Sequence, residues 1–257
     1  MNSSMEDTAY LSLPKIRYGS YTTKGIRDEN QDSMLIINES EVLAFVIADG
    51  AGGYSYGKQI SKITVDAIES EFRDIHSGNV NYIKLLIDKK YQQINSHIFK
   101  LEREMDSRMA STVAMLNIVE DNYIVSNVGD TKIFIVRDGE ITLISQVHNV
   151  AWELYENNEI DYEQYKNHKN KNVLTRALGG GSTVKPYYNI DKLRENDIFI
   201  ICSDGIHNYI GDKEIKDKFS VDMKISNEDL DKLCFEIAET CLESKSNDNL
   251  SIIAVQI

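Results

Sequence analysis

The sequence contains few cysteines, and their spacing does not suit a disulfide or metal framework. Among 257 residues there are only three, Cys202, Cys234 and Cys241. This odd number, with no C-x-x-C pair, argues against a disulfide-stapled fold and a structural zinc site. Unpaired thiols are typical of proteins kept in a reducing compartment, so we expect a cytoplasmic protein.

The sequence also lacks an excess of positive charge and any long apolar run. It has 28 basic and 41 acidic residues, for a formal charge of -13. This balance argues against nucleic acids and anionic membranes as partners and favours a protein that attracts cations. No segment approaches the roughly 20 apolar residues that span a bilayer, and MNSSMEDTAYLSLPKIRYGS lacks a signal-peptide pattern. We expect a monomer that does not bind membranes.

No composition shift or short repeat divides the chain. We interpret residues 1–14 as an N-terminal tail ending at Pro14, and residues 15–257 as one domain. Hydrophobic residues make up 42% of the sequence, which is sufficient for a large packed core.

The apolar pattern changes period along the chain. Strands are predicted before two long helices, whose apolar residues recur at helical spacing from Ile60 to Ile75 and from Ile83 to Leu101. Strands then resume, with hairpin turns at Asp121-Asn122 and Asp138-Gly139, and a last helix over Asn227 to Leu242 precedes the strand NLSIIAVQI. Strands and helices in separate runs predict an α+β fold, in which two packed antiparallel sheets lie between helix layers.

A polar stretch over residues 148–172 interrupts this order. It contains the single tryptophan, Trp152, with several Tyr and Asn, and little Pro, Gly or Ser. We interpret it as a surface insertion rather than a linker between domains.

The loop ADGAGGYSYGKQIS, residues 48–61, follows a buried strand and resembles two kinds of site. From Gly52 it nearly matches a phosphate-binding P-loop, but Gln59 stands where the P-loop needs a magnesium-binding Ser or Thr. Its opening, Asp49-Gly50, instead offers a carboxylate to a cation.

Two further acidic residues share the placement of Asp49 beside an apolar strand. Asp204 ends IFIICS, and Asp248 precedes the terminal strand. If these strands lie side by side, three carboxylates converge, and without cations they repel one another. Oxygen-only ligands suit Mg²⁺ or Mn²⁺, and Gly50 and Gly205 allow close backbone approach. The alternative is that each Asp-Gly pair simply forms a turn.

Arg27, in GIRDENQD, is a candidate for holding phosphate. A guanidinium grips phosphate oxygens in bidentate fashion, although an arginine in a turn is more often a solvated surface residue.

These motifs, in this order from about residue 17 to 257, resemble the metal-dependent serine/threonine protein phosphatases of type 2C, in their compact bacterial form. GIRDENQD is similar to the family's R-x-x-N-[EQ]-D, and ADGAGGYSYG to D-G-x-G-G-x-x-x-G. The remaining matches are MASTVAML, NVGDTKIFIVRDGEI, VHNVAWELYENNEI, HKNKNVLTRALGG, CSDGIHNYI and NDNLSIIAV. On this resemblance residues 148–172 are the family's flap.

The resemblance implies a site with two Mn²⁺ or Mg²⁺ ions. Asp49 would bridge them, the Gly50 carbonyl would bind one, and Asp204 and Asp248 would hold the other. Asp32 would act through water and Arg27 would bind the substrate phosphate.

Asp130 has two interpretations. It is either a hairpin-turn residue or, by the resemblance, a ligand of a third and weaker metal.

The implied reaction is hydrolysis of protein phosphoserine and phosphothreonine by a metal-activated water, reversing the action of a Ser/Thr kinase. Phosphoproteins and such a kinase would be the partners. The alternatives are a pseudophosphatase that binds phosphoproteins without turnover and a P-loop ATPase.

Four positions depart from the family pattern: Gln31, Ala51, Lys132 and Val147. Ala51 stands where eukaryotic members have a histidine that protonates the leaving group. The changes at Lys132 and Val147 concern the flap and its approach, and none removes an implied metal ligand.

Overall fold

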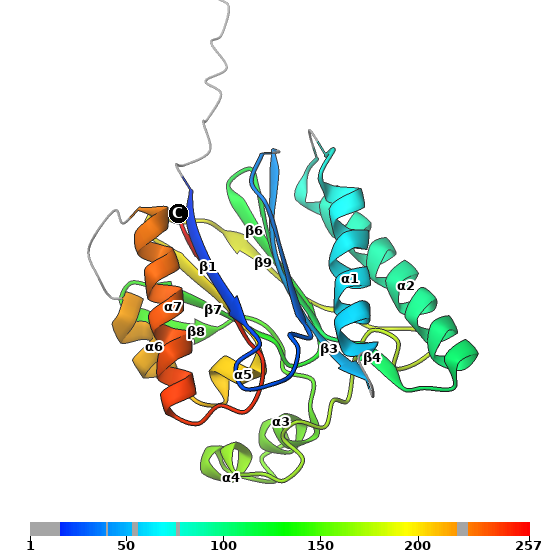
Figure 1. The fold of residues 1–257 in the computed structure, drawn as a ribbon. Helices are drawn as coiled ribbons and strands as arrows, with labels where there is room; N and C mark the ends of the chain where they lie inside the picture. The colour runs from blue at the N-terminus through cyan, green and yellow to red at the C-terminus, as the bar shows by residue number, and fades with distance from the viewer. Residues whose placement is uncertain (1–15, 40, 53–55, 76–77, 220–225) are drawn as a thin grey trace, which may run out of the picture.

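The chain folds into two antiparallel sheets packed face to face between helices (Figure 1). This computed structural model describes residues 16–39, 41–52, 56–75, 78–219 and 226–257. The predicted tail, residues 1–14, lies outside the described residues. The arrangement confirms the predicted α+β sandwich.

The first sheet joins the two ends of the described chain. Its order is β1-β11-β10-β7-β8, with every pair antiparallel. The strands are β1 (Arg17–Thr23), β11 (Leu250–Gln256), β10 (Ile198–Cys202), β7 (Lys132–Arg137) and β8 (Glu140–Leu143).

The second sheet has the order β2-β3-β5-β6-β9, and β4 pairs with the end of β3. The strands are β2 (Asp32–Ile37), β3 (Val42–Gly52), β4 (Met109–Ser111), β5 (Val113–Val119), β6 (Asn122–Val128) and β9 (Tyr187–Lys192).

Helices cover the outer face of each sheet (Figure 1). α1 (Tyr56–Phe72) and α2 (Val80–Met105) pack on the second sheet, while α5 (Asp204–His207), α6 (Asp212–Phe219) and α7 (Asn227–Glu243) lie on the first. None of the described helices is both long and apolar enough to cross a bilayer.

The layer between the sheets is apolar. Phe45 and Ile47 of β3, Phe199 of β10 and Ile253 of β11 are fully buried there. Each of these strands is also buried on its helix side, which explains why their sequences are continuously apolar rather than alternating.

The stretch predicted as a surface insertion, called the flap below, contains two short helices, α3 (Val150–Glu156) and α4 (Tyr162–Lys166). Each has a side-chain cap. Asn149 accepts a hydrogen bond from the backbone of Trp152, and Asp161 forms a capping box with Gln164. The D-x-x-Q spacing was the signal for α4.

One predicted turn is displaced by a residue. Asn122 already pairs with Val119 in the β5–β6 ladder, so this hairpin turns at Glu120 and Asp121 rather than at Asp121 and Asn122. Glu120 adopts a φ of 55° there. The turn at Asp138-Gly139 is confirmed, with positive φ at both residues.

Candidate metal centre

Asp49 and Asp32 lie opposite each other on neighbouring strands of the second sheet. The β2–β3 register pairs them directly, near the start of β2 and the end of β3. Asp49 is fixed through its backbone: its N–H donates to Thr112 Oγ1 at 3.0 Å and its carbonyl accepts from Thr112 N at 2.8 Å.

Asp204 and Asp248 come from the first sheet. Asp204 begins α5 directly after β10, and Asp248 lies two residues before β11, which pairs with β10. The expectation that three strands lie side by side is therefore correct for β10 and β11 only, because β3 belongs to the other sheet. The carboxylates approach one another across the sandwich.

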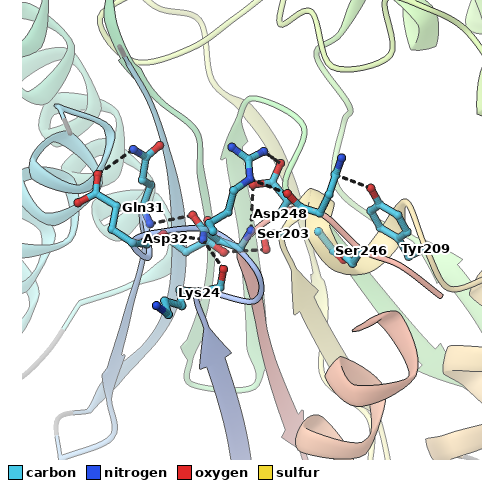
Figure 2. A network of polar contacts seen from close by, with 12 residues as sticks. Lys24, Gln31, Asp32, Ser203, Tyr209, Ser246 and Asp248 are labelled. Carbon is cyan, nitrogen blue, oxygen red and sulfur yellow. Dashed lines mark hydrogen bonds and ion pairs between the residues drawn. The ribbon is translucent and has the colours of Figure 1, made fainter. Parts of the chain in front are cut away.

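Hydrogen bonds connect the two sheets at this point. Ser203 Oγ donates to Asp32 Oδ2 at 2.9 Å and accepts from Ser251 N at 3.1 Å. Asn249 accepts from Gln31 N at 2.8 Å and donates to the Glu29 carbonyl at 2.9 Å. Figure 2 shows Asp32, Ser203 and Asp248 in one network of polar contacts.

Sequence reasoning did not assign the positioning role of Ser203, Asn249 or Thr112. All three lie within the quoted motifs CSDGIHNYI, NDNLSIIAV and MASTVAML, which were the available signal.

The glycines after two of the aspartates allow backbone to pack on backbone. A Cβ on Gly50 would lie 1.9 Å from the Gly57 carbonyl oxygen, and one on Gly205 would lie 1.9 Å from the Asn249 carbonyl oxygen. The neighbours in these contacts are protein backbone. They hold the start of α1 against β3 and α5 against the approach to β11.

The carboxylates repel one another strongly. Burial, followed by the charges of Asp32, Asp204, Asp130 and Asp248, raises the pKa of Asp49 well above its usual value. Burial raises the pKa of Asp32 to about 6, and burial with the neighbouring carboxylates also raises that of Asp204. A cation would relieve this repulsion.

Among the described residues, no three His, Cys, Asp or Glu side chains are arranged around one metal position. The charges of Asp32, Asp130, Asp204 and Asp248 nevertheless all act on Asp49, which places the five carboxylates in one cluster. Their buried oxygen donors suit Mg²⁺ or Mn²⁺, which retain several waters and therefore need few protein ligands.

Arg27 is half exposed and pairs with one of the carboxylates. Its Nη2 lies 2.9 Å from Asp248 Oδ2, and its Nε donates to the Asn247 carbonyl at 2.5 Å. It also lines a hollow of about 420 Å³ with Gln31 and Asn249. Arg27, expected to bind the substrate phosphate, therefore contacts Asp248, an expected metal ligand.

Asp130 is buried, at 5% exposure, in the turn between β6 and β7. Burial raises the pKa of Asp130 to about 6, although a hydrogen bond from Asn149, at the base of the flap, acts to lower it. His207 Nε2 lies 3.1 Å from its backbone oxygen. The Asp130 charge acts on both Asp49 and Asp204, which a solvated turn residue would not do.

Lys132, one of the four departures, faces the flap. It is 3% exposed, and its ammonium lies 5.7 Å from the Trp152 ring and 5.8 Å from the Tyr165 ring. Val147 is buried beside the base of the flap, and Ala51 is exposed. The Gln31 side chain donates a hydrogen bond to the Glu29 carboxylate. None of the four occupies the carboxylate cluster.

Comparison with known proteins identifies the family. The model of the protein phosphatase 2C family matches residues 25–251. A putative protein phosphatase 2C-type of Streptococcus pyogenes serotype M6 is 30% identical over 191 residues, covering 74% of this chain and 78% of the relative. This chain belongs to the protein phosphatase 2C family of metal-dependent phosphoprotein phosphatases.

Solved structures agree with the fold. The serine/threonine phosphatase of S. agalactiae superposes with a TM-score of 0.87 at 26% identity, covering 94% of this chain and 99% of that one. The catalytic domain of the phosphatase PstP, solved in complex with two manganese ions, gives a TM-score of 0.80 at 22% identity, with coverages of 94% and 97%. The P-loop interpretation gains no support from these matches.

Proposed function

We propose that this chain is a bacterial serine/threonine protein phosphatase that hydrolyses phosphoserine and phosphothreonine in proteins. The observation that carries the proposal is the group of carboxylates gathered from both sheets, in which burial and neighbouring aspartates raise the pKa of Asp49 and of Asp204. Bound cations would offset the repulsion in such a group, and all the aspartates expected as ligands are retained, which argues against a pseudophosphatase.

The carboxylate and carbonyl oxygens of the cluster are the donor types that Mn²⁺ and Mg²⁺ prefer. We propose Asp49 as the bridging ligand, the Gly50 carbonyl as a ligand of one ion, and Asp204 and Asp248 as ligands of the other. Asp32 would act through water, held in place by Ser203. The ions supply acidification of water and neutralisation of phosphate charge when bound. Asp130, with its raised pKa, is the proposed ligand of a third, weaker ion.

Arg27 is the proposed phosphate-binding residue. Its contact with Asp248 links substrate binding to metal binding, since a carboxylate that coordinates a cation attracts the guanidinium less. Arg27, half exposed and on a loop, is then free to turn toward the phosphate and orient it for in-line attack.

The wider biological assignments are also proposals. We expect residues 15–257 to act as one catalytic domain, as a monomer, in the cytoplasm, where the three buried free thiols would stay reduced. Its partners would be a Ser/Thr kinase and that kinase's phosphorylated substrates.

The test is hydrolysis of p-nitrophenyl phosphate and of a phosphothreonine peptide with Mn²⁺, with a chelated sample as control and ATP in parallel. We expect turnover of both phosphate esters that is lost on chelation. Phosphopeptide binding without turnover would instead identify a pseudophosphatase, and turnover of ATP alone would favour an ATPase.

A further inference from the structure

A large groove begins beside the carboxylate cluster and is lined by three cationic side chains. Its volume is about 890 Å³, and Ala51, two residues after Asp49, forms part of its lining. Ala51 pairs in register with Ala110 of β4, which also lines the groove. A phosphorylated side chain held at Asp49 would therefore have its neighbouring residues at the mouth of this groove.

The charge of the groove is opposite to that of the whole protein. Arg108, Arg176 and Lys185 line it, against a single carboxylate, Glu102. None of the three cations forms an ion pair with any residue in the described ranges. In a chain of formal charge -13, three cations without carboxylate partners around one hollow point to a negatively charged ligand.

The wall of the groove is fixed in place before any ligand arrives. Asn95 of α2 accepts from Gly179 N at 2.9 Å and donates to the Gly181 carbonyl at 3.0 Å. Leu178 and Ser111 exchange backbone hydrogen bonds of 2.9 and 3.0 Å. Ser111 Oγ also donates to the Asp49 carbonyl at 3.2 Å, so the wall and the cluster belong to one hydrogen-bonded frame. A preformed wall lowers the entropy lost on binding.

We propose that this groove binds acidic residues flanking the phosphorylated Ser or Thr of the protein substrate, and so selects phosphosites in acidic sequences. The inference rests on the proposed phosphatase function. Arg108 and Lys185 are exposed and act as specificity residues for the peptide. Arg176 contacts His148 Nε2 at 3.1 Å and so also belongs to the base of the flap.

The experiment compares two phosphothreonine peptides, one with Glu on both sides of the phosphosite and one with Gln at those positions. We expect the wild type to favour the acidic peptide by about tenfold in kcat/KM at low salt, mainly through KM, with the preference falling as salt rises. Lys185→Glu and Arg108→Glu should each reduce the preference to less than half. Lys213→Glu, an equal charge change on exposed α6, is the matched control and should keep it.

p-Nitrophenyl phosphate, which has no flanking residues, separates the outcomes. The groove proposal is wrong if the wild type shows no preference for the acidic peptide, or if both groove variants keep the wild-type preference. In either case, hydrolysis of p-nitrophenyl phosphate would still support the proposed phosphatase activity. An equal loss on the small ester would show that the variants damage the cluster instead. Lys185→Gln and Arg108→Gln provide the same comparison if a charge reversal prevents folding. If the wild type hydrolyses none of these substrates, the proposed phosphatase function is itself wrong.

Discussion

The carboxylate cluster and the flap lie on the same sandwich but are stabilised in opposite ways. In the cluster, buried aspartates raise one another's pKa, and the sheets hold them together against that repulsion. In the flap, Trp152, Tyr155, Tyr162 and Tyr165 pack on one another, with the Trp152 and Tyr165 rings 5.1 Å apart and nearly perpendicular.

This difference separates function from local stability. The flap gains stability from its own aromatic contacts, its caps and the cation of Lys132. The cluster is a locally unfavourable arrangement that the rest of the fold supports, as expected where a ligand completes a site. Removing the Asp49 charge should therefore lower activity and raise stability without metal, whereas removing an aromatic ring of the flap should affect stability alone.

The largest expected effect is on turnover at the cluster. Asp49→Asn should reduce kcat by at least about 10³-fold, equal to about 4 kcal/mol in barrier, because a neutral amide cannot bridge two divalent ions. The measurement is hydrolysis of p-nitrophenyl phosphate at saturating Mn²⁺. The control is Asp66→Asn, at an exposed position of α1. A fall in kcat of less than about tenfold would contradict the bridging role of Asp49.

The same variant should be more stable than the wild type without metal. The pKa of Asp49 is raised in the folded state, so its ionisation destabilises the fold above that pKa, and the penalty disappears as pH falls toward the unfolded value. Urea unfolding with a chelator should show a higher free energy of unfolding for the variant at pH 7.5, and this gain should shrink toward pH 4.

The difference between variant and wild type cancels the opposing contribution of His148. Burial and then Arg176 lower the His148 pKa to about 4, so the folded state loses stability as pH falls below the ordinary histidine range. An Asp49→Asn protein that is less stable at pH 7.5 would contradict the repulsion described for the cluster.

Arg27→Ala tests the exposed side of the cluster. We expect KM for a phosphopeptide to rise about tenfold with a smaller change in kcat, since the guanidinium meets phosphate in both ground and transition states. Mn²⁺ affinity by calorimetry should not fall, because Asp248 loses its competing partner. Loss of Mn²⁺ binding would reassign Arg27 as a structural residue, and Arg27→Lys shows how much of the effect needs the forked geometry.

Asp130→Ala should have a smaller effect that depends on the leaving group. We expect kcat to fall severalfold on a phosphopeptide and less on p-nitrophenyl phosphate, whose leaving group needs little protonation. The reason is that the third ion would lie near the leaving oxygen, where Ala51 offers no proton. Two tightly bound ions and an unchanged melting temperature should remain. Equal losses on both substrates would contradict this role, and a large fall in melting temperature would favour the turn interpretation.

The smallest effect is expected in the flap. The indole N–H of Trp152 is buried and has no hydrogen-bond partner in the described part of the chain. Trp152→Phe removes this unsatisfied donor while keeping an aromatic ring, so the free energy of unfolding should change by less than about 1 kcal/mol. Trp152→Ala, which removes the ring from Tyr165 and Lys132, is the comparison and should destabilise clearly more in thermal unfolding.

The sequence predicted those features that depend on local order. The apolar runs and helical periods predicted the strands and the long helices, and the Asp-Gly motifs marked Asp49 and Asp204. Asp204 does follow its strand, whereas β3 continues past Asp49 to Gly52, where it pairs with β4. The sequence did not predict that β3 and β10 belong to different sheets, because strand order depends on contacts distant in sequence. Nor did it predict the contact of Arg27 with Asp248, since those residues lie 221 positions apart.

The placement of Asp49 on one sheet and Asp204 on the other has a geometric consequence. Two packed sheets are separated by about 10 Å, and that spacing depends on the side chains between them. Here the layer includes Phe45, Phe199 and Ile253, none of which is part of the centre. The separation of the carboxylates therefore depends on the thickness of the apolar core, and so would the size of any cation held between them.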